Sequence, residues 1–136
     1  MYVFRALRSL ERLLAAERFP ESQFESRQAH ERSLNLLVRC LTPAQRAEFE
    51  RSKAFEVRGE SGQCYRITYA RNLNIEVVAP SGMVVRRICA GPVDVPTPAV
   101  MLAQKLMLET QEAEFLRIAR TTDVVSAALG REIRRR

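Results

Sequence analysis

The hydrophobic period of this chain changes twice along its length. Residues 1–54 carry apolar positions at helical spacing, whereas residues 55–90 alternate between apolar and polar side chains at the period of a β-strand. Helical spacing returns over residues 96–133. This order predicts a single α+β domain, residues 1–136, in which N-terminal helices precede a four-stranded antiparallel β-meander and a long C-terminal helix packs on the sheet.

Two helices are predicted before residue 42. The first covers about residues 2–18, where leucines recur on one face, and Phe19-Pro20 ends it. The second opens at Ser22-x-x-Glu25, which has the spacing of a capping box. Its expected apolar face consists of Leu34, Leu37, Val38 and Leu41.

A third, short helix has the sharpest local signal in the chain. Thr42 is suited to the N-cap position and Pro43 to the first helical position. Gln45 can close a capping box with Thr42. We expect this helix to end near Lys53.

Turn residues divide residues 55–89 into four predicted strands. The predicted turns lie at residues 59–62, 72–74 and 80–82, which are rich in Gly, Asn, Ser and Pro. Alternation places Tyr65 and Tyr69 on the buried face together with Ile67, opposite Arg66. The inward register of the fourth strand, residues 83–89, stays open. No internal repeat is apparent.

The predicted long helix, residues 99–119, is apolar on two sides. Such a helix is normally buried on both sides, and the favoured interpretation places it between the sheet and the N-terminal helices. The alternative leaves one apolar side for a partner or a second copy of the chain. That candidate apolar interface consists of Met101, Met107, Leu108 and Phe115. A last short helix is predicted over residues 123–133, followed by an arginine tail.

The formal net charge is +6, and all but Lys53 and Lys105 of the 22 basic residues are arginine. This bias suits phosphate contact and interface pairing, although a GC-rich genome would produce it with no functional meaning. The charge is spread thinly along the chain, which weakens the case for nucleic acid. The candidate partner or phosphate contacts are Arg58, Arg66, Arg71, Arg86, Arg87, Arg134, Arg135 and Arg136.

One face of the meander is expected to carry Arg58, Arg66 and Arg86. A nucleic-acid reader would interleave such arginines with aromatic side chains, but the tyrosines of the strands are predicted on the opposite face. Glu56 and Glu76 also lie among the arginines, and cross-strand Glu–Arg pairing accounts for this pattern equally well.

The sequence carries no recognisable catalytic or metal-binding constellation. Its cysteines are Cys40, Cys64 and Cys89, an odd number at wide spacing, which favours reduced thiols. Structural zinc takes ligands in close pairs, and nucleophilic catalysis needs a positioned base, whereas His30 is the single histidine and is far in sequence from every thiol. We therefore expect no metal, no cofactor and no enzymatic activity.

Several short motifs recur together in one known group of proteins. They are Val57-Arg58-Gly59, Tyr65-Arg66-Ile67, Asn74-Ile75-Glu76, Cys89, Pro92, Pro96 and Met101-Leu102-Ala103-Gln104-Lys105. On these motifs, residues 41–119 resemble a family of small uncharacterised bacterial proteins with a Tyr-Arg-Ile strand and a Met-Leu-Ala-Gln-Lys helix. The resemblance implies a domain boundary and no activity.

Together these features predict a non-catalytic accessory or regulatory protein that acts through protein–protein interaction with an unidentified partner. The alternative is a basic nucleic-acid-binding protein that contacts DNA or RNA phosphates, weakly and non-specifically, through the arginine face of the sheet and the C-terminal tail. No apolar run is long enough to span a membrane and the N-terminus does not resemble a secretion signal, so a cytoplasmic location is expected. Homo-oligomerisation is left open.

Overall fold

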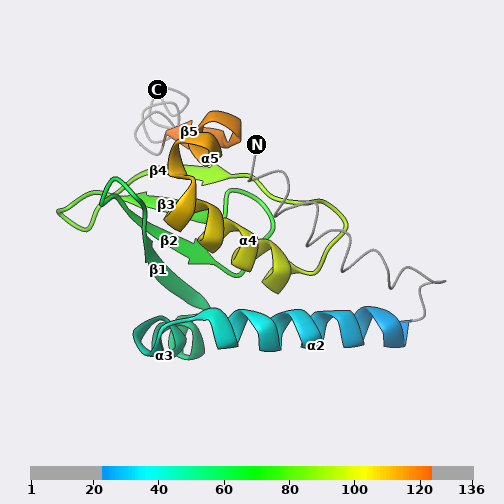
Figure 1. The fold of residues 1–136 in the computed structure, drawn as a ribbon. Helices are drawn as coiled ribbons and strands as arrows, with labels where there is room; N and C mark the ends of the chain where they lie inside the picture. The colour runs from blue at the N-terminus through cyan, green and yellow to red at the C-terminus, as the bar shows by residue number, and fades with distance from the viewer. Residues whose placement is uncertain (1–22, 124–136) are drawn as a thin grey trace, which may run out of the picture.

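The computed structural model describes residues 23–123, which form four helices and one five-stranded antiparallel sheet (Figure 1). The helices are α2 (Gln23–Cys40), α3 (Pro43–Ser52), α4 (Thr97–Thr110) and α5 (Glu112–Ile118). The strands are β1 (Ala54–Arg58), β2 (Cys64–Thr68), β3 (Ile75–Val78), β4 (Val84–Cys89) and β5 (Arg120–Asp123), in the spatial order β1-β2-β3-β4-β5. The predicted α+β class is confirmed. The predicted helix over residues 2–18 and the C-terminal arginine tail lie outside the described residues.

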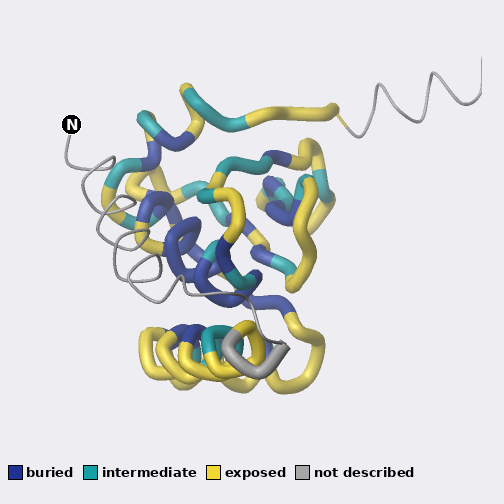
Figure 2. Tube along the Cα trace, turned by 90° about the vertical axis from the view of Figure 1, so that its right-hand side faces the viewer, coloured by how far each residue is buried: buried dark blue, intermediate teal, exposed yellow. Residues whose placement is uncertain are grey.

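The core lies between one face of the sheet and the helices. Alternate strand residues are buried, as the period of a β-strand requires; for example, Phe55, Ile67 and Ile75 are completely buried. α4 lies over this face, α2 packs against α4, and α3 packs against β1. The side of α2 that faces the sheet is buried and its far side is exposed (Figure 2). Leu37 and Leu41 belong to that buried side, as predicted.

The capping box predicted for α3 is present. The Gln45 backbone N–H donates to Thr42 Oγ1, and Gln45 Oε1 accepts from the Thr42 backbone N–H, at 3.2 and 3.0 Å. Two of the N–H groups that a helix start leaves without backbone partners are thereby satisfied. The helix ends at Lys53, which adopts left-handed dihedrals with φ at 57°.

Side chains of α3 also occupy the outer edge of the sheet. Glu56 of β1 donates its backbone N–H to Glu48 Oε2 at 3.0 Å, and its carbonyl accepts from Gln45 Nε2 at 2.8 Å. Within residues 23–123, β1 has β2 as its single neighbouring strand, so these backbone groups would otherwise lack strand partners there. Gln45 therefore closes the helix cap and covers a strand edge at once.

The β1–β2 and β3–β4 hairpins repeat one turn design, which corrects the prediction of no internal repeat. Turn residues 59–62 align with residues 79–82, and the two hairpins share the local sequence Glu-Val-x-Gly/Ala-x-Ser-Gly. In both turns the first residue donates its N–H across the turn to the fifth residue, at 2.9 and 2.8 Å. The shared glycines, Gly62 and Gly82, have φ values of +87° and +86°, which side chains disfavour.

The second hairpin differs from the first by one additional residue in β4. Val77 pairs with Arg86 but Val78 pairs with Val84, so a β-bulge leaves Val85 without a partner in β3. This bulge reverses the side-chain alternation midway along β4. The sequence left open which residues of β4 point toward the helices. The bulge makes that alternation different on its two sides.

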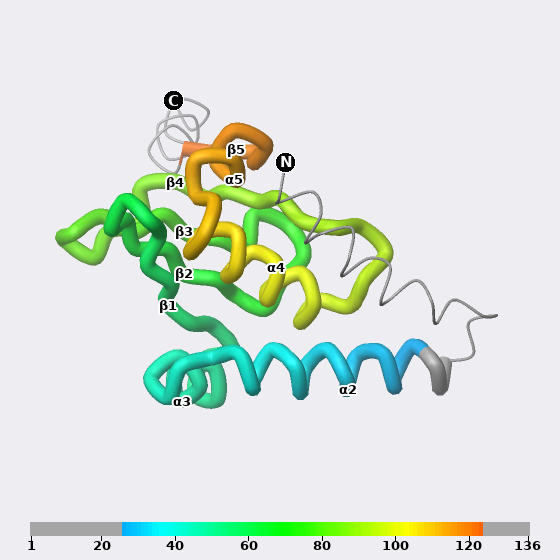
Figure 3. Tube along the Cα trace, viewed as in Figure 1, coloured from blue at the N-terminus to red at the C-terminus, as the bar shows by residue number. Residues whose placement is uncertain are grey.

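The predicted single helix over residues 99–119 is wrong in one respect. The helix breaks at Gln111, whose φ and ψ are −148° and 52°, and the shorter α5 follows (Figure 3). The backbone N–H of Glu112 donates to Glu60 Oε1 at 2.9 Å, and Glu112 Oε1 accepts from the Ser61 N–H at 3.0 Å. These two bonds form a clamp, hereafter the turn clamp, that fastens the β1–β2 turn to the start of α5.

The predicted four-strand meander is extended by a fifth strand. β5 pairs antiparallel with β4, with Arg87 opposite Thr122 and Cys89 opposite Arg120. The helix predicted from Asp123 onwards does not begin there, because Asp123 is the last residue of β5. The rest of that predicted helix lies outside the described residues.

A buried amide pair joins α4 to the sheet. Asn74 Nδ2 donates to Gln104 Oε1 at 2.7 Å, and Gln104 Nε2 donates back to Asn74 Oδ1 at 2.9 Å. The remaining donors reach the carbonyls of Thr68 and Ala90 at 3.2 and 3.0 Å. Both side chains are nearly fully buried, at 3% and 0% exposure, so every one of these bonds replaces a lost water contact.

We expect the amide pair to be energetically coupled. Gln104→Met keeps side-chain length but leaves the Asn74 amide without its partner, and should lower the free energy of unfolding by about 1–3 kcal/mol. Asn74→Leu should act similarly. The double variant should lose at least about 1 kcal/mol less than the sum of the two, because no unpaired amide remains.

Urea unfolding of the two single variants and the double variant measures this coupling. Gln28→Met, at an exposed position of α2, is the matched control and should stay within about 0.5 kcal/mol of the parent chain. Strictly additive losses would contradict a coupled pair.

We also expect Gly59 to tolerate alanine far less well than its counterpart Ala79 tolerates glycine. A Cβ on Gly59 would lie 1.6 Å from Glu112 Oε2 and 2.9 Å from Tyr65 Cε2. Gly59→Ala should therefore displace the turn clamp and cost about 1–3 kcal/mol. Ala79→Gly should cost less than about 1 kcal/mol.

The double variant Gly59→Ala/Glu112→Ala identifies the cause. Once the carboxylate is removed, the added methyl group has space, so the two losses should be less than additive in urea unfolding. Equal effects of Gly59→Ala and Ala79→Gly would show that the clamp does not restrict this position.

Candidate protein-binding surface

The face of the sheet that points away from α4, hereafter the open face, carries a row of alternating charges. Strand register places Glu56 opposite Arg66, Arg66 opposite Glu76, and Glu76 opposite Arg87. We call these four residues the charged row. Residues directly opposite on antiparallel strands point to the same side of the sheet, so all four belong to one surface. Glu56, Arg66 and Arg87 are exposed, and Glu76 is half-buried.

The charged row has no net charge. Each arginine lies between or beside carboxylates on neighbouring strands, at distances typical of cross-strand neighbours. A polyanion lying across this row would meet a carboxylate on every second strand. The arrangement suits a partner whose own surface alternates in charge better than it suits a continuous phosphate backbone.

Only part of the predicted arginine set lies on the open face. Arg58 does, and its Nη1 donates to the Gly62 carbonyl at 3.0 Å. Arg87 also does, whereas Arg86 pairs with Val77 and therefore points to the helix side of the sheet. The prediction that Arg86 projects beside Arg66 is thus wrong, because the bulge in β4 changes the alternation that it assumed.

The remaining predicted contacts lie elsewhere. Arg71 is in the loop between β2 and β3 and lines a hollow at the end of the sheet, together with Arg120. Arg134, Arg135 and Arg136 lie outside the described residues.

The prediction of an exposed apolar interface on α4 and α5 is wrong. Its residues are all buried, at 0% exposure for Met101 and Leu108, 5% for Met107 and 1% for Phe115. α4 packs against α2 as well as the sheet, so its two apolar sides serve the protein's own core. The favoured interpretation of the two-sided helix is therefore confirmed.

The two strand tyrosines have different surroundings. Tyr65 is buried as predicted, but Tyr69 is 38% exposed. β2 ends at Thr68, so alternation no longer governs Tyr69, and its hydroxyl lies 3.4 Å from His30 Nε2. The two rings meet edge to face with centroids 6.2 Å apart. His30 thus contacts a phenol, an arrangement that supplies an aromatic contact between α2 and the sheet.

The cysteines are free thiols on three separate elements: Cys40 is exposed at the end of α2, while Cys64 and Cys89 are half-buried on β2 and β4. Burial, followed by the nearby Glu56 carboxylate, raises the pKa of the Cys64 thiol. Within residues 23–123, no group of three His, Cys, Asp or Glu side chains is placed to hold a metal ion.

The buried phenol of Tyr65 lies next to the turn clamp. Burial, followed by the Glu112 carboxylate, raises the pKa of Tyr65 far above its ordinary value. Glu112 is itself 5% exposed, and its Oε2 has no hydrogen-bond partner among the described residues. Because Glu112 Oε1 is already engaged by the turn, this arrangement fixes local structure rather than presenting a group to solvent.

Sequence patterns missed Glu60, Glu112 and the strand containing Arg120. The Glu60–Glu112 contact joins residues 52 positions apart, which no local pattern encodes. The hairpin repeat could have been found, because matching Glu56 with Glu76 and Ser61 with Ser81 aligns both turns. That alignment would also have indicated the additional residue in β4.

Comparison with protein-family models, with curated proteins and with solved structures found no match to this chain. The resemblance over residues 41–119 therefore stays a prediction. No helix within the described part of the chain has the length and apolar character needed to cross a membrane.

We expect Tyr65 to make stability fall at high pH. Its raised folded-state pKa means that folding favours the neutral phenol. The resulting contribution to the free energy of unfolding is complete below the unfolded-state pKa of about 10, and it is lost as pH rises from there through the folded-state pKa. The free energy of unfolding should fall by up to about 1.4 kcal/mol per pH unit above about pH 10. Tyr65→Phe should remove this part of the decline.

Urea unfolding between about pH 8 and about pH 11 measures the effect against the variant. Tyr69→Phe, which alters a partly exposed phenol, is the matched control and should keep the decline. Identical pH profiles for the parent chain and Tyr65→Phe would contradict the assignment.

Proposed function

We propose that this chain is a non-catalytic accessory protein that binds a protein partner through the open face of its sheet. The observation that carries the proposal is the charged row, in which two carboxylates and two guanidinium groups alternate on neighbouring strands. Alternating charges contribute to partner choice and register more than to affinity, because wrongly aligned surfaces bring like charges together.

The partner is expected to present a complementary alternation of charge on a flat surface. The helices pack on the other face of the sheet, and α3 side chains already occupy the backbone of β1. Recognition is therefore expected through side chains on the open face rather than through added strand pairing at β1.

We expect inversion of the charged row to abolish partner binding without unfolding the protein. The variant Glu56→Arg/Arg66→Glu/Glu76→Arg/Arg87→Glu keeps both the net charge and the alternation across the strands. Its stability should stay within about 1 kcal/mol of the parent chain, because every cross-strand pair remains oppositely charged. Its surface pattern is nevertheless the reverse of the one that the partner matches.

Affinity capture from an extract of the source organism, with mass spectrometry, tests this prediction. Arg46→Glu/Glu50→Arg is the matched control, because it inverts two exposed charges on α3 at unchanged net charge. A specific partner should be retained by the parent chain and the control, and lost by the four-residue variant. Retention by all three would overturn the proposal.

Nucleic-acid binding is the competing outcome of the same experiment. Phosphate contact depends on total basic charge, so affinity for any DNA or RNA would survive inversion of the row and would fall steeply with salt. Capture of nucleic acid with that behaviour, in place of a protein, would favour the alternative function.

A further inference from the structure

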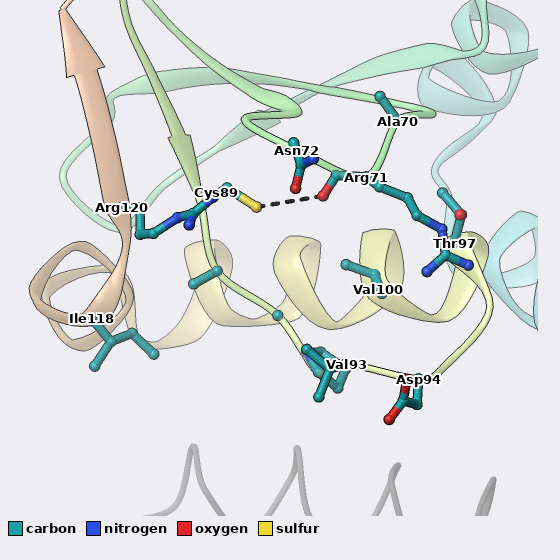
Figure 4. Close-up of a pocket in the computed structure, with 13 residues that line it drawn as sticks. Ala70, Arg71, Asn72, Cys89, Val93, Asp94, Thr97, Val100, Ile118 and Arg120 are labelled. Atoms are coloured by element: carbon teal, nitrogen blue, oxygen red, sulfur yellow. Dashed lines mark hydrogen bonds between the residues drawn. The ribbon is translucent and has the colours of Figure 1, made fainter.

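A hollow at one end of the sheet, hereafter the end pocket, has a volume of about 830 Å³. It is bounded by the β2–β3 loop, the end of β4 with the connector to α4, the first turns of α4, and the junction of α5 with β5 (Figure 4). A cavity of this size is within the range of small-molecule sites. It contains no residue of the charged row, so its role is independent of the proposed protein partner.

The apolar part of the end pocket is aliphatic. Val100 and Ile118 line it from α4 and α5, and Val93 lines it from the connector. Val93 is 79% exposed, so an apolar side chain stands at the rim with most of its surface in water. Among the described lining residues there is no Phe, Tyr or Trp, so these residues offer no stacking surface to a base or aromatic ring. The lining suits an aliphatic ligand.

The polar part of the end pocket is predominantly cationic. Arg71 enters from the β2–β3 loop and Arg120 from β5, and Figure 4 shows the two side chains at opposite ends of the lining. Among the described lining residues, Arg71 and Arg120 supply two positive charges and Asp94 supplies one negative charge. Guanidinium groups bind carboxylate and phosphate through paired N–H donors, and the amide of Asn72 and hydroxyl of Thr97 add hydrogen-bonding groups.

The backbone brings these groups together because the connector closely approaches α4. A Cβ on Gly91 would lie 2.8 Å from Val100 Cγ1, so glycine permits this approach. Gln104 Nε2 holds the neighbouring Ala90 carbonyl at 3.0 Å. The amide pair that anchors α4 therefore also fixes one wall of the end pocket.

We propose that the end pocket binds a small aliphatic anion, a short-chain compound with a carboxylate or phosphate head. The head is held by Arg71 or Arg120 and the chain by the aliphatic lining. Cys89 provides a reporter within the same pocket: its thiol lines the hollow, with Sγ 3.8 Å from the Arg71 carbonyl oxygen.

Protection of Cys89 from alkylation tests the proposal on the full chain. The protein is treated with iodoacetamide, and the rates at Cys89 and Cys40 are followed separately by peptide mass spectrometry. Cys40 is exposed on α2 and outside the pocket, so it is an internal control. About 10 mM hexanoate should slow alkylation of Cys89 about threefold, as a Kd of about 5 mM for so small a ligand implies, and leave Cys40 unchanged.

Parallel probes identify the head group. Hexyl phosphate at the same concentration distinguishes a phosphate preference from a carboxylate preference, and stronger protection by either identifies the preferred head. Hexylamine has the same chain with a positive head and should not protect. Equal protection by hexylamine, protection of Cys40 as well as Cys89, or no protection by either anion would overturn the proposal.

The variant Arg71→Gln/Arg120→Gln tests the arginines directly. Both side chains are exposed, so the urea midpoint should be unchanged, while protection of Cys89 by hexanoate or hexyl phosphate should be lost. Arg46→Gln/Arg51→Gln, two exposed arginines on α3, is the matched control and should keep full protection. Full protection in the pocket variant would also overturn the proposal.

Discussion

The structure depends on how firmly α4 is held over one face of the sheet. Two contacts of different chemistry hold it: the amide pair of Asn74 and Gln104 near its middle, and the turn clamp just past its end. Buried polar contacts of this kind are costly when incomplete, so they specify one docking position where apolar packing alone would accept several. The helix side of the sheet is thereby closed, and the charged row proposed to bind a partner lies on the opposite face.

The two proposed sites use arginine in different ways. On the open face, Arg66 and Arg87 alternate with carboxylates, so the row has alternating charges and no net positive charge. In the end pocket, Arg71 and Arg120 line a hollow whose described residues include several aliphatic side chains and one acid, and the proposed role of their charge is to select an anion. The net charge of +6 is thus divided among local environments, which is why its sum says little about partners.

Features encoded within a few residues were predictable from the sequence. The capping box of Thr42 and Gln45 is present, and the turns around Gly62 and Gly82 lie where their glycines indicated. Alternation correctly separated buried from exposed positions on β1 and β2. Predictions failed where a distant contact decides the geometry: the helix breaks at Gln111 because the β1–β2 turn binds the residue after it, and β5 exists because β4 offers it an edge. One residue in β4 was enough to misplace Arg86.

The occupied edge of β1 also limits how copies of this protein can aggregate. Unlimited stacking of sheets into a fibre needs two unoccupied edges on every molecule, one to accept a strand and one to offer it. Glu48 and Gln45 already bond the outward backbone groups of Glu56, so an incoming strand would have to displace them. Two copies could still pair through the opposite edge of the sheet, at β5. Pairing at that edge alone would produce a closed dimer rather than an amyloid-like polymer.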